Sequence, residues 1–157
     1  MRRATAVGAV VLLLGVGGCG ARVEVLGIRF GSECPVVARP MSTLAVTEEE
    51  ATVHLWVSNQ SFEEPDVELR VSVDGEVVAE QVFDVCGQHM WVPFPLALEP
   101  GWHDLVATTP GGLRVEGRVE VPEMVDPSAV PWVVVSHWTQ DSPHVSVDVG
   151  TGLIGFA

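Results

Sequence analysis

Cys86, His89 and Met90 stand close together in the stretch CGQHM and are the residues most able to do chemistry. A cysteine thiolate, a histidine and a weakly bound methionine are ligands that a blue-copper site combines with a second histidine. His54, upstream, could supply that second histidine. However, Met90 directly follows His89 and begins an alternating apolar run, so no loop remains between them to fold over a metal. The stretch therefore permits a copper site without favouring one.

The histidines offer a second possible metal site. None of the five is spaced as H-x-H or H-x-x-x-H, the short spacings that place two imidazoles on one metal. His137 and His144 flank one predicted turn and could face each other across a hairpin, which would permit a weak zinc or copper site. The metal-ligand alternatives are therefore His89, His137 and His144, whereas the preferred prediction is that no metal or other cofactor is bound.

Tryptophan is the other unusual component, with five residues in a chain of this length. Trp56 alternates with a run of apolar residues and so falls on the opposite face of its predicted strand. Trp132 and Trp138 share one register of a later strand. A tryptophan on a solvent-facing surface can stack on a sugar or contact a protein. The alternative, which we favour, is that both faces of a central strand are partly covered.

Catalytic patterns are missing from the sequence. It contains no G-x-S-x-G, H-E-x-x-H, Walker loop or dinucleotide fingerprint. His103 and Asp104 are neighbours on a predicted strand, so their side chains point to opposite faces and form no dyad. Two acidic clusters, at 48–50 and 63–68, lack the D-x-D-x-D-G spacing of a calcium loop and are predicted to be solvated loops. Loops at one end of a sandwich could still bring the two clusters together. The sequence therefore predicts a protein that is not an enzyme.

The N-terminal sequence has the pattern of an export signal. Arg2 and Arg3 precede an apolar segment, 4–18, that is too short to span a bilayer comfortably. The segment ends in Val16-Gly17-Gly18-Cys19, which resembles the lipobox of bacterial lipoproteins. The resemblance implies cleavage before Cys19, diacylglycerol on its sulfur and usually an acyl chain on its new amine. Two or more chains anchor a protein stably in a bilayer. It further implies a membrane-anchored location on the extracytoplasmic side of a bacterial cell envelope.

After that cleavage two cysteines remain, Cys34 and Cys86. Exported proteins fold in an oxidising environment, so an even pair is first interpreted as a disulfide. The bond would close a loop of about fifty residues, for which chain entropy gives a stabilisation of about 4 kcal/mol at the upper end. A disulfide at Cys86 also weakens the copper interpretation, because it uses the thiolate that the metal would need.

The charge of the chain limits its partners. The formal net charge is −13, the chain has no lysine, and loss of two signal arginines would lower the charge by two, to −15. Such a chain is unsuited to nucleic acid, where affinity comes from neutralising phosphates, and to anionic lipid head groups. The expected partners are the lipid bilayer, through acylated Cys19, and another envelope protein that the sequence does not identify.

Alternation of apolar and polar residues with period two dominates the rest of the chain and predicts strands. Asp74-Gly75 between two such runs predicts a tight hairpin, and Pro93 and Pro95 predict an edge or bulged strand, because proline cannot donate to a ladder. The proline-rich stretch 122–131 is predicted to be a connector. The expected strands lie at 22–30, 51–58, 66–73, 76–83, 90–98, 102–109, 113–121, 132–138 and 144–150.

Turn signals about every ten residues indicate a β-sandwich. The stretch LEPGWHDL, Leu98–Leu105, resembles the Ig-like and fibronectin type III-like modules of bacterial surface proteins over roughly 51–121. The tyrosine corner is excluded because the chain has no tyrosine, and the cysteines lack antibody-domain spacing. The predicted fold is an all-β, Ig-like antiparallel β-sandwich of about eight or nine strands with one disulfide.

The predicted organisation has four parts: a lipoprotein signal peptide at 1–18, an N-terminal segment with the first strand at 19–50, the sandwich core at 51–121, and a connector with C-terminal strands at 122–157 that completes the same domain. The expected function is a lipid-anchored envelope module that binds or supports another protein without catalysis. The alternatives are an envelope protein that binds copper or zinc and a glycan-binding module.

Overall fold

The structure is a computed structural model that describes residues 23–25, 28–30, 38–39, 41–61, 63–85, 91–126 and 128–152. The predicted lipid attachment at Cys19, the predicted Cys34–Cys86 disulfide and the candidate ligand His89 lie outside the described residues. The chain divides into two compact units, Met1–Glu33 and Cys34–Ala157.

In the first unit, β1 (Val23–Val25) and β2 (Ile28–Phe30) pair as antiparallel strands. The prediction of a single strand over 22–30 is therefore wrong, because this stretch contains a pair of short strands.

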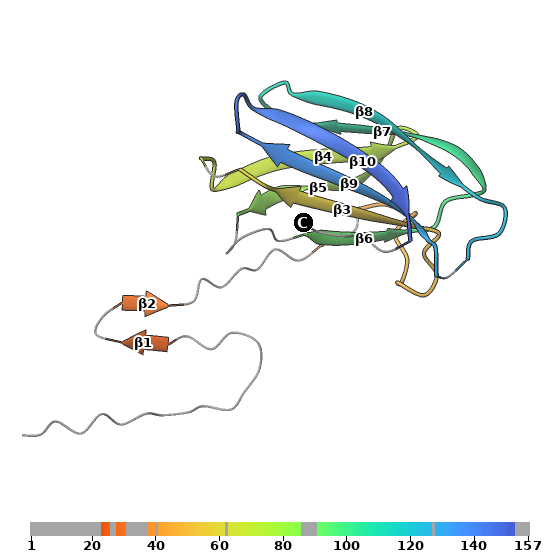
Figure 1. Cartoon of the computed structure of the whole chain (residues 1–157), viewed down its shortest axis with the longest axis horizontal. Helices are drawn as coiled ribbons and strands as arrows, with labels where there is room; N and C mark the ends of the chain where they lie inside the picture. The colour runs from red at the N-terminus through yellow and green to blue at the C-terminus, as the bar shows by residue number, and fades with distance from the viewer. Residues whose placement is uncertain are drawn as a thin grey trace, which may run out of the picture. The chain divides into compact units, whose positions relative to one another are not determined.

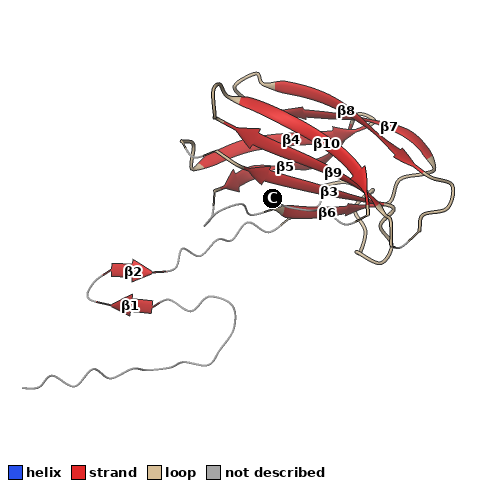
Figure 2. Ribbon diagram, viewed as in Figure 1, coloured by secondary structure: helices blue, strands red, loops and turns tan. Residues whose placement is uncertain are grey.

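The second unit contains eight strands in two four-stranded sheets (Figures 1 and 2). We call β10-β9-β3-β6 the first sheet and β5-β4-β7-β8 the second sheet, in their order of pairing. No helix occurs among the described residues, and the all-β sandwich is confirmed. The strands are β3 (Val53–Asn59), β4 (Asp66–Val73), β5 (Glu76–Asp84), β6 (Val92–Leu96), β7 (Gly101–Thr108), β8 (Arg114–Val121), β9 (Pro131–Trp138) and β10 (His144–Thr151).

The β4–β5 hairpin shows how the local sequence produces this architecture. The apolar residues of β4 are buried between the sheets and the alternating polar ones face outward. Asp74 and Gly75 form the two-residue turn with φ of 50° and 85°, which is the left-handed backbone that a type I′ turn requires at both positions. The predicted Asp-Gly hairpin is therefore confirmed.

The core lies between the inward faces of the two sheets. Leu55 of the first sheet and Leu69 and Leu105 of the second are all at most 2% exposed. The rings of Phe83 on β5 and Phe94 on β6 meet edge to face, with centroids 6.4 Å apart. Full burial of one such side chain contributes about 1.5–3 kcal/mol, so these side chains hold the sheets face to face.

Strand order corrects one detail of the expected antiparallel sandwich. β9 runs parallel to β3, with His54 opposite Trp132 and Asn59 opposite His137. Parallel neighbours cannot be joined by a tight turn and need a long crossover; here the chain from β4 to β8 provides it. β6 lies at the edge of the first sheet, which confirms the edge position predicted from its prolines.

Three connections meet at one end of the sandwich, the left-hand end in Figure 1. They join β3 to β4, β7 to β8 and β9 to β10. Loops of a sandwich cluster at its two ends and leave the strands as a rigid support. At this end the described side chains line a cleft that contains a buried histidine and several carboxylates.

Candidate functional site

Residues from these three connections and the adjoining strand ends line a cleft of about 530 Å³, which we call the loop-end cleft. Its volume falls within the range of pockets that hold small ligands, roughly 300–1,000 Å³. The apolar part of the lining comes from Val67, Pro110, Leu113 and Pro143, and the polar part from Glu64, Asp66, Glu68, Thr109 and His137.

His137 is the buried polar residue of the loop-end cleft, at 1% exposure. Its Nδ1 lies 3.4 Å from Oδ1 of Asn59 on the neighbouring strand. The Asn59 amide nitrogen donates to the carbonyls of Glu64 and Phe83, at 3.0 and 3.2 Å, so Oδ1 is the atom that faces the imidazole. Oδ1 also accepts from the Ser61 backbone N–H at 3.0 Å. An amide oxygen only accepts hydrogen bonds, so its contact with Nδ1 favours the tautomer of His137 that carries the hydrogen on Nδ1 and leaves a lone pair on Nε2.

That lone pair faces a carboxylate. Nε2 of His137 lies 3.7 Å from Oε2 of Glu64, which is too long for a hydrogen bond. Burial lowers the pKa of His137, the Glu64 carboxylate opposes this shift, and His144 adds to it. The imidazole is therefore neutral near pH 7, and two hydrogen-bond acceptors stand side by side with no donor between them.

The rim of the cleft adds more negative charge. Asp66 lies directly opposite Asp84 across the β4–β5 ladder, and like charges in that position destabilise each other. Glu68 follows on the same exposed face of β4. Among the described residues, no arginine forms an ion pair with Glu64, Asp66 or Glu68. The cleft therefore carries uncompensated carboxylates around a buried lone pair.

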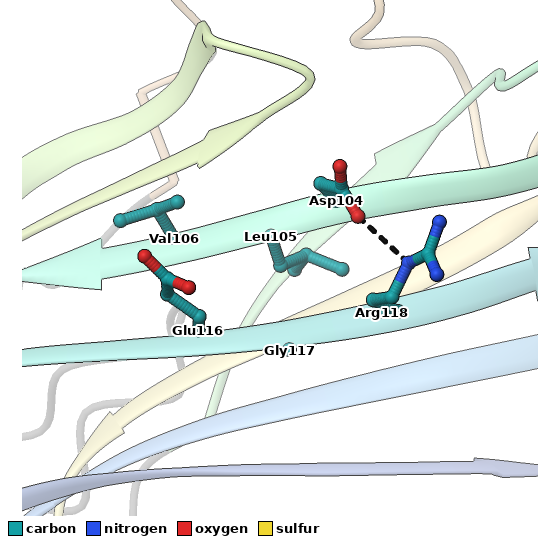
Figure 3. A pocket seen from close by; sticks show the side chains of 6 residues that line it. All are labelled: Asp104, Leu105, Val106, Glu116, Gly117 and Arg118. Carbon is teal, nitrogen blue, oxygen red and sulfur yellow. Dashed lines mark ion pairs between the residues drawn. The ribbon is translucent and has the colours of Figure 1, made fainter.

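A second depression, of about 440 Å³ (Figure 3), differs in this respect. The ion pair drawn there joins Arg118 Nε to Asp104 Oδ1 at 2.7 Å, and Glu116 accepts from Arg114 at 2.6 Å. The Arg118 guanidinium also lies 5.4 Å from the ring centre of Trp102. The charges of this second depression are already compensated, which makes it the weaker candidate for a functional site. The lining residues are Asp104, Leu105, Val106, Glu116, Gly117 and Arg118.

The three tryptophans selected from the sequence share the outward face of the first sheet. Trp56 lies on β3, and Trp132 and Trp138 lie on β9; all three are half-buried. The Trp132 ring rests on the backbone of Gly150, where an added Cβ would lie 2.4 Å from it. Trp138 donates through Nε1 to Ser146 Oγ at 3.3 Å. The rings thus lie along the strands and partly cover this face.

The two turn-flanking histidines do not converge. His137 pairs with Val145 and points into the sandwich, whereas His144 pairs with Trp138 and is exposed. Nδ1 of His144 lies 2.9 Å from the Ser142 carbonyl oxygen. Among the described residues, no group of three histidine, cysteine or carboxylate side chains is arranged to hold a metal ion.

The two acidic clusters also stay apart. Glu48 reaches His54 near the start of β3, with Oε2 3.2 Å from Nε2, whereas Glu64 follows the end of that strand. They therefore lie at opposite ends of β3, and only the second cluster contributes to the loop-end cleft. The sequence pattern suggested solvated loops and did not reveal that Glu64 faces a buried histidine.

His103 has a partner that sequence reasoning missed. Its Nδ1 lies 2.7 Å from Asp74 Oδ2 and its Nε2 lies 2.7 Å from the Glu99 carbonyl oxygen. Asp74 also accepts from the Asp104 backbone N–H at 2.9 Å. Burial alone would lower the pKa of His103, but the bonds to Glu99 and Asp74 outweigh it and raise that pKa. This cluster joins the β4–β5 turn to β7 and serves the fold.

No family model, curated protein or solved structure matches the chain. Across the residues that the structure describes, no helix has the length and apolarity to cross a membrane.

Proposed function

We propose that this protein is a lipid-anchored module of the bacterial cell envelope that binds another protein and performs no catalysis. The observation that supports binding most strongly is the loop-end cleft. It combines a buried imidazole lone pair, an adjacent carboxylate and apolar walls on a rigid sandwich. A partner that donates hydrogen bonds to both groups would be favoured at this position.

The anchor in this proposal is Cys19. The lipobox-like residues before it support cleavage and acylation at that position, and the acidic chain leaves attachment to the lipid chains. Metabolic labelling with a palmitate analogue tests this part: label should enter the wild-type protein and be lost in Cys19→Ala. Label retained in Cys19→Ala, or absent from the wild type, would remove the anchor from the proposal.

Site-specific photo-crosslinking in cells tests the binding part. A photoreactive residue at Gly111, which lines the cleft on the β7–β8 connection, should yield one discrete cross-linked envelope protein. The matched position is Glu123, an exposed residue just after β8 and so at the other end of that strand. Equal yields from the two positions, or no product at Gly111, would contradict binding through the loop-end cleft.

A further inference from the structure

We propose that the loop-end cleft receives a single arginine side chain of the partner protein, whose guanidinium donates to both His137 and Glu64. This inference rests on the proposed binding function and specifies the chemistry of the contact.

The need for a donor follows from the fixed hydrogen-bond network. Asn59 favours a hydrogen on Nδ1 of His137, because its own amide nitrogen is committed to the Glu64 and Phe83 carbonyls and its oxygen, 3.4 Å from Nδ1, can only accept. Nε2 and the carboxylate oxygen then lie 3.7 Å apart as two acceptors. One group with several N–H donors can satisfy both atoms.

The donor should be cationic. Asp66 and Glu68 on β4 add negative charge to that of Glu64 around the cleft. The nearest described arginine in sequence to the lining, Arg114 at the start of β8, is already paired with Glu116. His144 on β10 also lowers the pKa of His137 through its charge. A positive ligand from outside would offset the carboxylates that the chain itself leaves unpaired.

The walls of the cleft favour a side chain over a metal ion. Val67, Pro110 and Leu113 offer apolar contact for an aliphatic stem, which basic side chains bury while their charged heads reach polar groups. A cleft of about 530 Å³ is far larger than a single ion needs. Arginine fits better than lysine because its planar fork presents several donors at fixed positions.

Nuclear magnetic resonance of the full-length chain in detergent at pH 7.5 tests the inference. The probe is the blocked peptide acetyl-Gly-Arg-Gly-amide, and the readout is the imidazole nitrogen resonance of His137. We expect a saturable shift of Nε2 with the arginine peptide, a weaker effect with the lysine peptide and none with the neutral citrulline peptide. Glu64→Gln should weaken binding roughly tenfold or more, since it removes a charge-assisted hydrogen bond.

The matched control is Glu63→Gln, which removes the same charge from the adjacent residue, outside the cleft lining. It should bind the arginine peptide as the wild type does, and the backbone spectra of both variants should show an intact fold. Equal binding of citrulline or lysine, or no saturable shift, would overturn the inference. So would Zn²⁺ alone shifting His137 in a Glu64-dependent way while the arginine peptide does not.

Failure of this inference differs from failure of the proposed function. If the peptide does not bind but Gly111 still gives its cross-link and Glu123 does not, the partner uses this end of the sandwich through other chemistry. If neither result is obtained, the binding function itself fails.

Discussion

His137 and His103 respond to protonation in opposite ways because their surroundings differ. His137 lies beside the amide oxygen of Asn59, and its burial lowers its pKa. His103 has an acceptor at each ring nitrogen, Asp74 and the Glu99 carbonyl, and its pKa is raised. His137 is therefore held as a hydrogen-bond acceptor at Nε2, and His103 as a donor at both ring nitrogens.

The protonated ring of His103 should stabilise the folded state below pH 6.5, and this stabilisation should be lost as pH rises through the raised folded pKa. His103→Ala should lower the free energy of unfolding by about 1 kcal/mol at pH 6 and by less at pH 8.5. Urea denaturation of wild type and variant at both pH values measures this difference. An equal loss at both pH values would show that the ring acts only by packing.

For His137, the dependence of stability on pH has the opposite sign. Its pKa is lowered from 6.5, so the unfolded chain takes up the proton first and stability is lost as pH falls below 6.5. The charged or titratable groups around it are Glu64, Asp66, Glu68 and His144. Replacement His137→Gln should flatten the fall in unfolding free energy between pH 7 and pH 5. A variant that falls as steeply as the wild type would contradict the assignment of a buried neutral imidazole.

At the level of elements, tight turns and close strand contacts determine where side chains can be added. Gly75 takes the second left-handed position of the β4–β5 turn, with φ of 85°. Gly117 lies where β8 of the second sheet meets β10 of the first, and a Cβ there would lie 2.6 Å from Val147 Cγ1. The first glycine is required by backbone conformation and the second by space.

Gly75→Ala should destabilise the domain by about 1 kcal/mol, because alanine is strained at positive φ. Gly111→Ala is the matched control, since its added Cβ meets only the Thr109 hydroxyl at an ordinary 3.6 Å. Thermal unfolding of the two variants should separate them, with little change for Gly111→Ala. Similar losses in both would argue against the turn geometry.

Gly117→Ala should cost about 1–3 kcal/mol through overpacking against Val147. Because the clash involves one side chain, Val147→Ala in the same chain should recover part of the loss, and a double-mutant cycle measures that coupling. Strictly additive losses would mean that β8 and β10 do not meet at this point.

The strands themselves could be predicted from the sequence because alternation directly reports which side of a strand is buried. Apolar positions of β4 and the Asp74-Gly75 turn needed no knowledge of distant residues. The parallel pairing of β3 with β9 could not be predicted, since periodicity does not say which strand lies beside which. His137 was selected as a possible ligand, but its partner Asn59 lies 78 residues away and becomes adjacent only through that pairing.

At the scale of the whole molecule, an acidic chain with a net charge of −13 has a rigid sandwich whose surface charges are unevenly compensated. On the outer face of the second sheet, Arg70, Arg114 and Arg118 each pair with a carboxylate. At the loop end the carboxylates lack such partners among the described residues. This contrast is the reason that we propose the loop end, and not the outer face of the second sheet, as the binding surface.

The predicted disulfide is also a property of the whole molecule. Thiol titration of the denatured full-length chain should find no reactive thiol before reduction, since Cys19 would be acylated and Cys34 bonded to Cys86. Reduction should then lower stability by about 2–4 kcal/mol, the usual contribution of such a bond. Reactive Cys34 and Cys86 before reduction would exclude the disulfide and favour a metal-binding role for Cys86.

The most direct test of binding through the loop-end cleft compares the Gly111 photo-cross-link in cells that carry Glu64→Gln or Glu63→Gln. The two variants lose the same charge from adjacent residues, but only Glu64 lines the cleft beside His137. We predict that Glu64→Gln abolishes the cross-linked product and Glu63→Gln preserves it. Equal yields from the two variants would contradict a partner contact at Glu64 and His137 in this cleft.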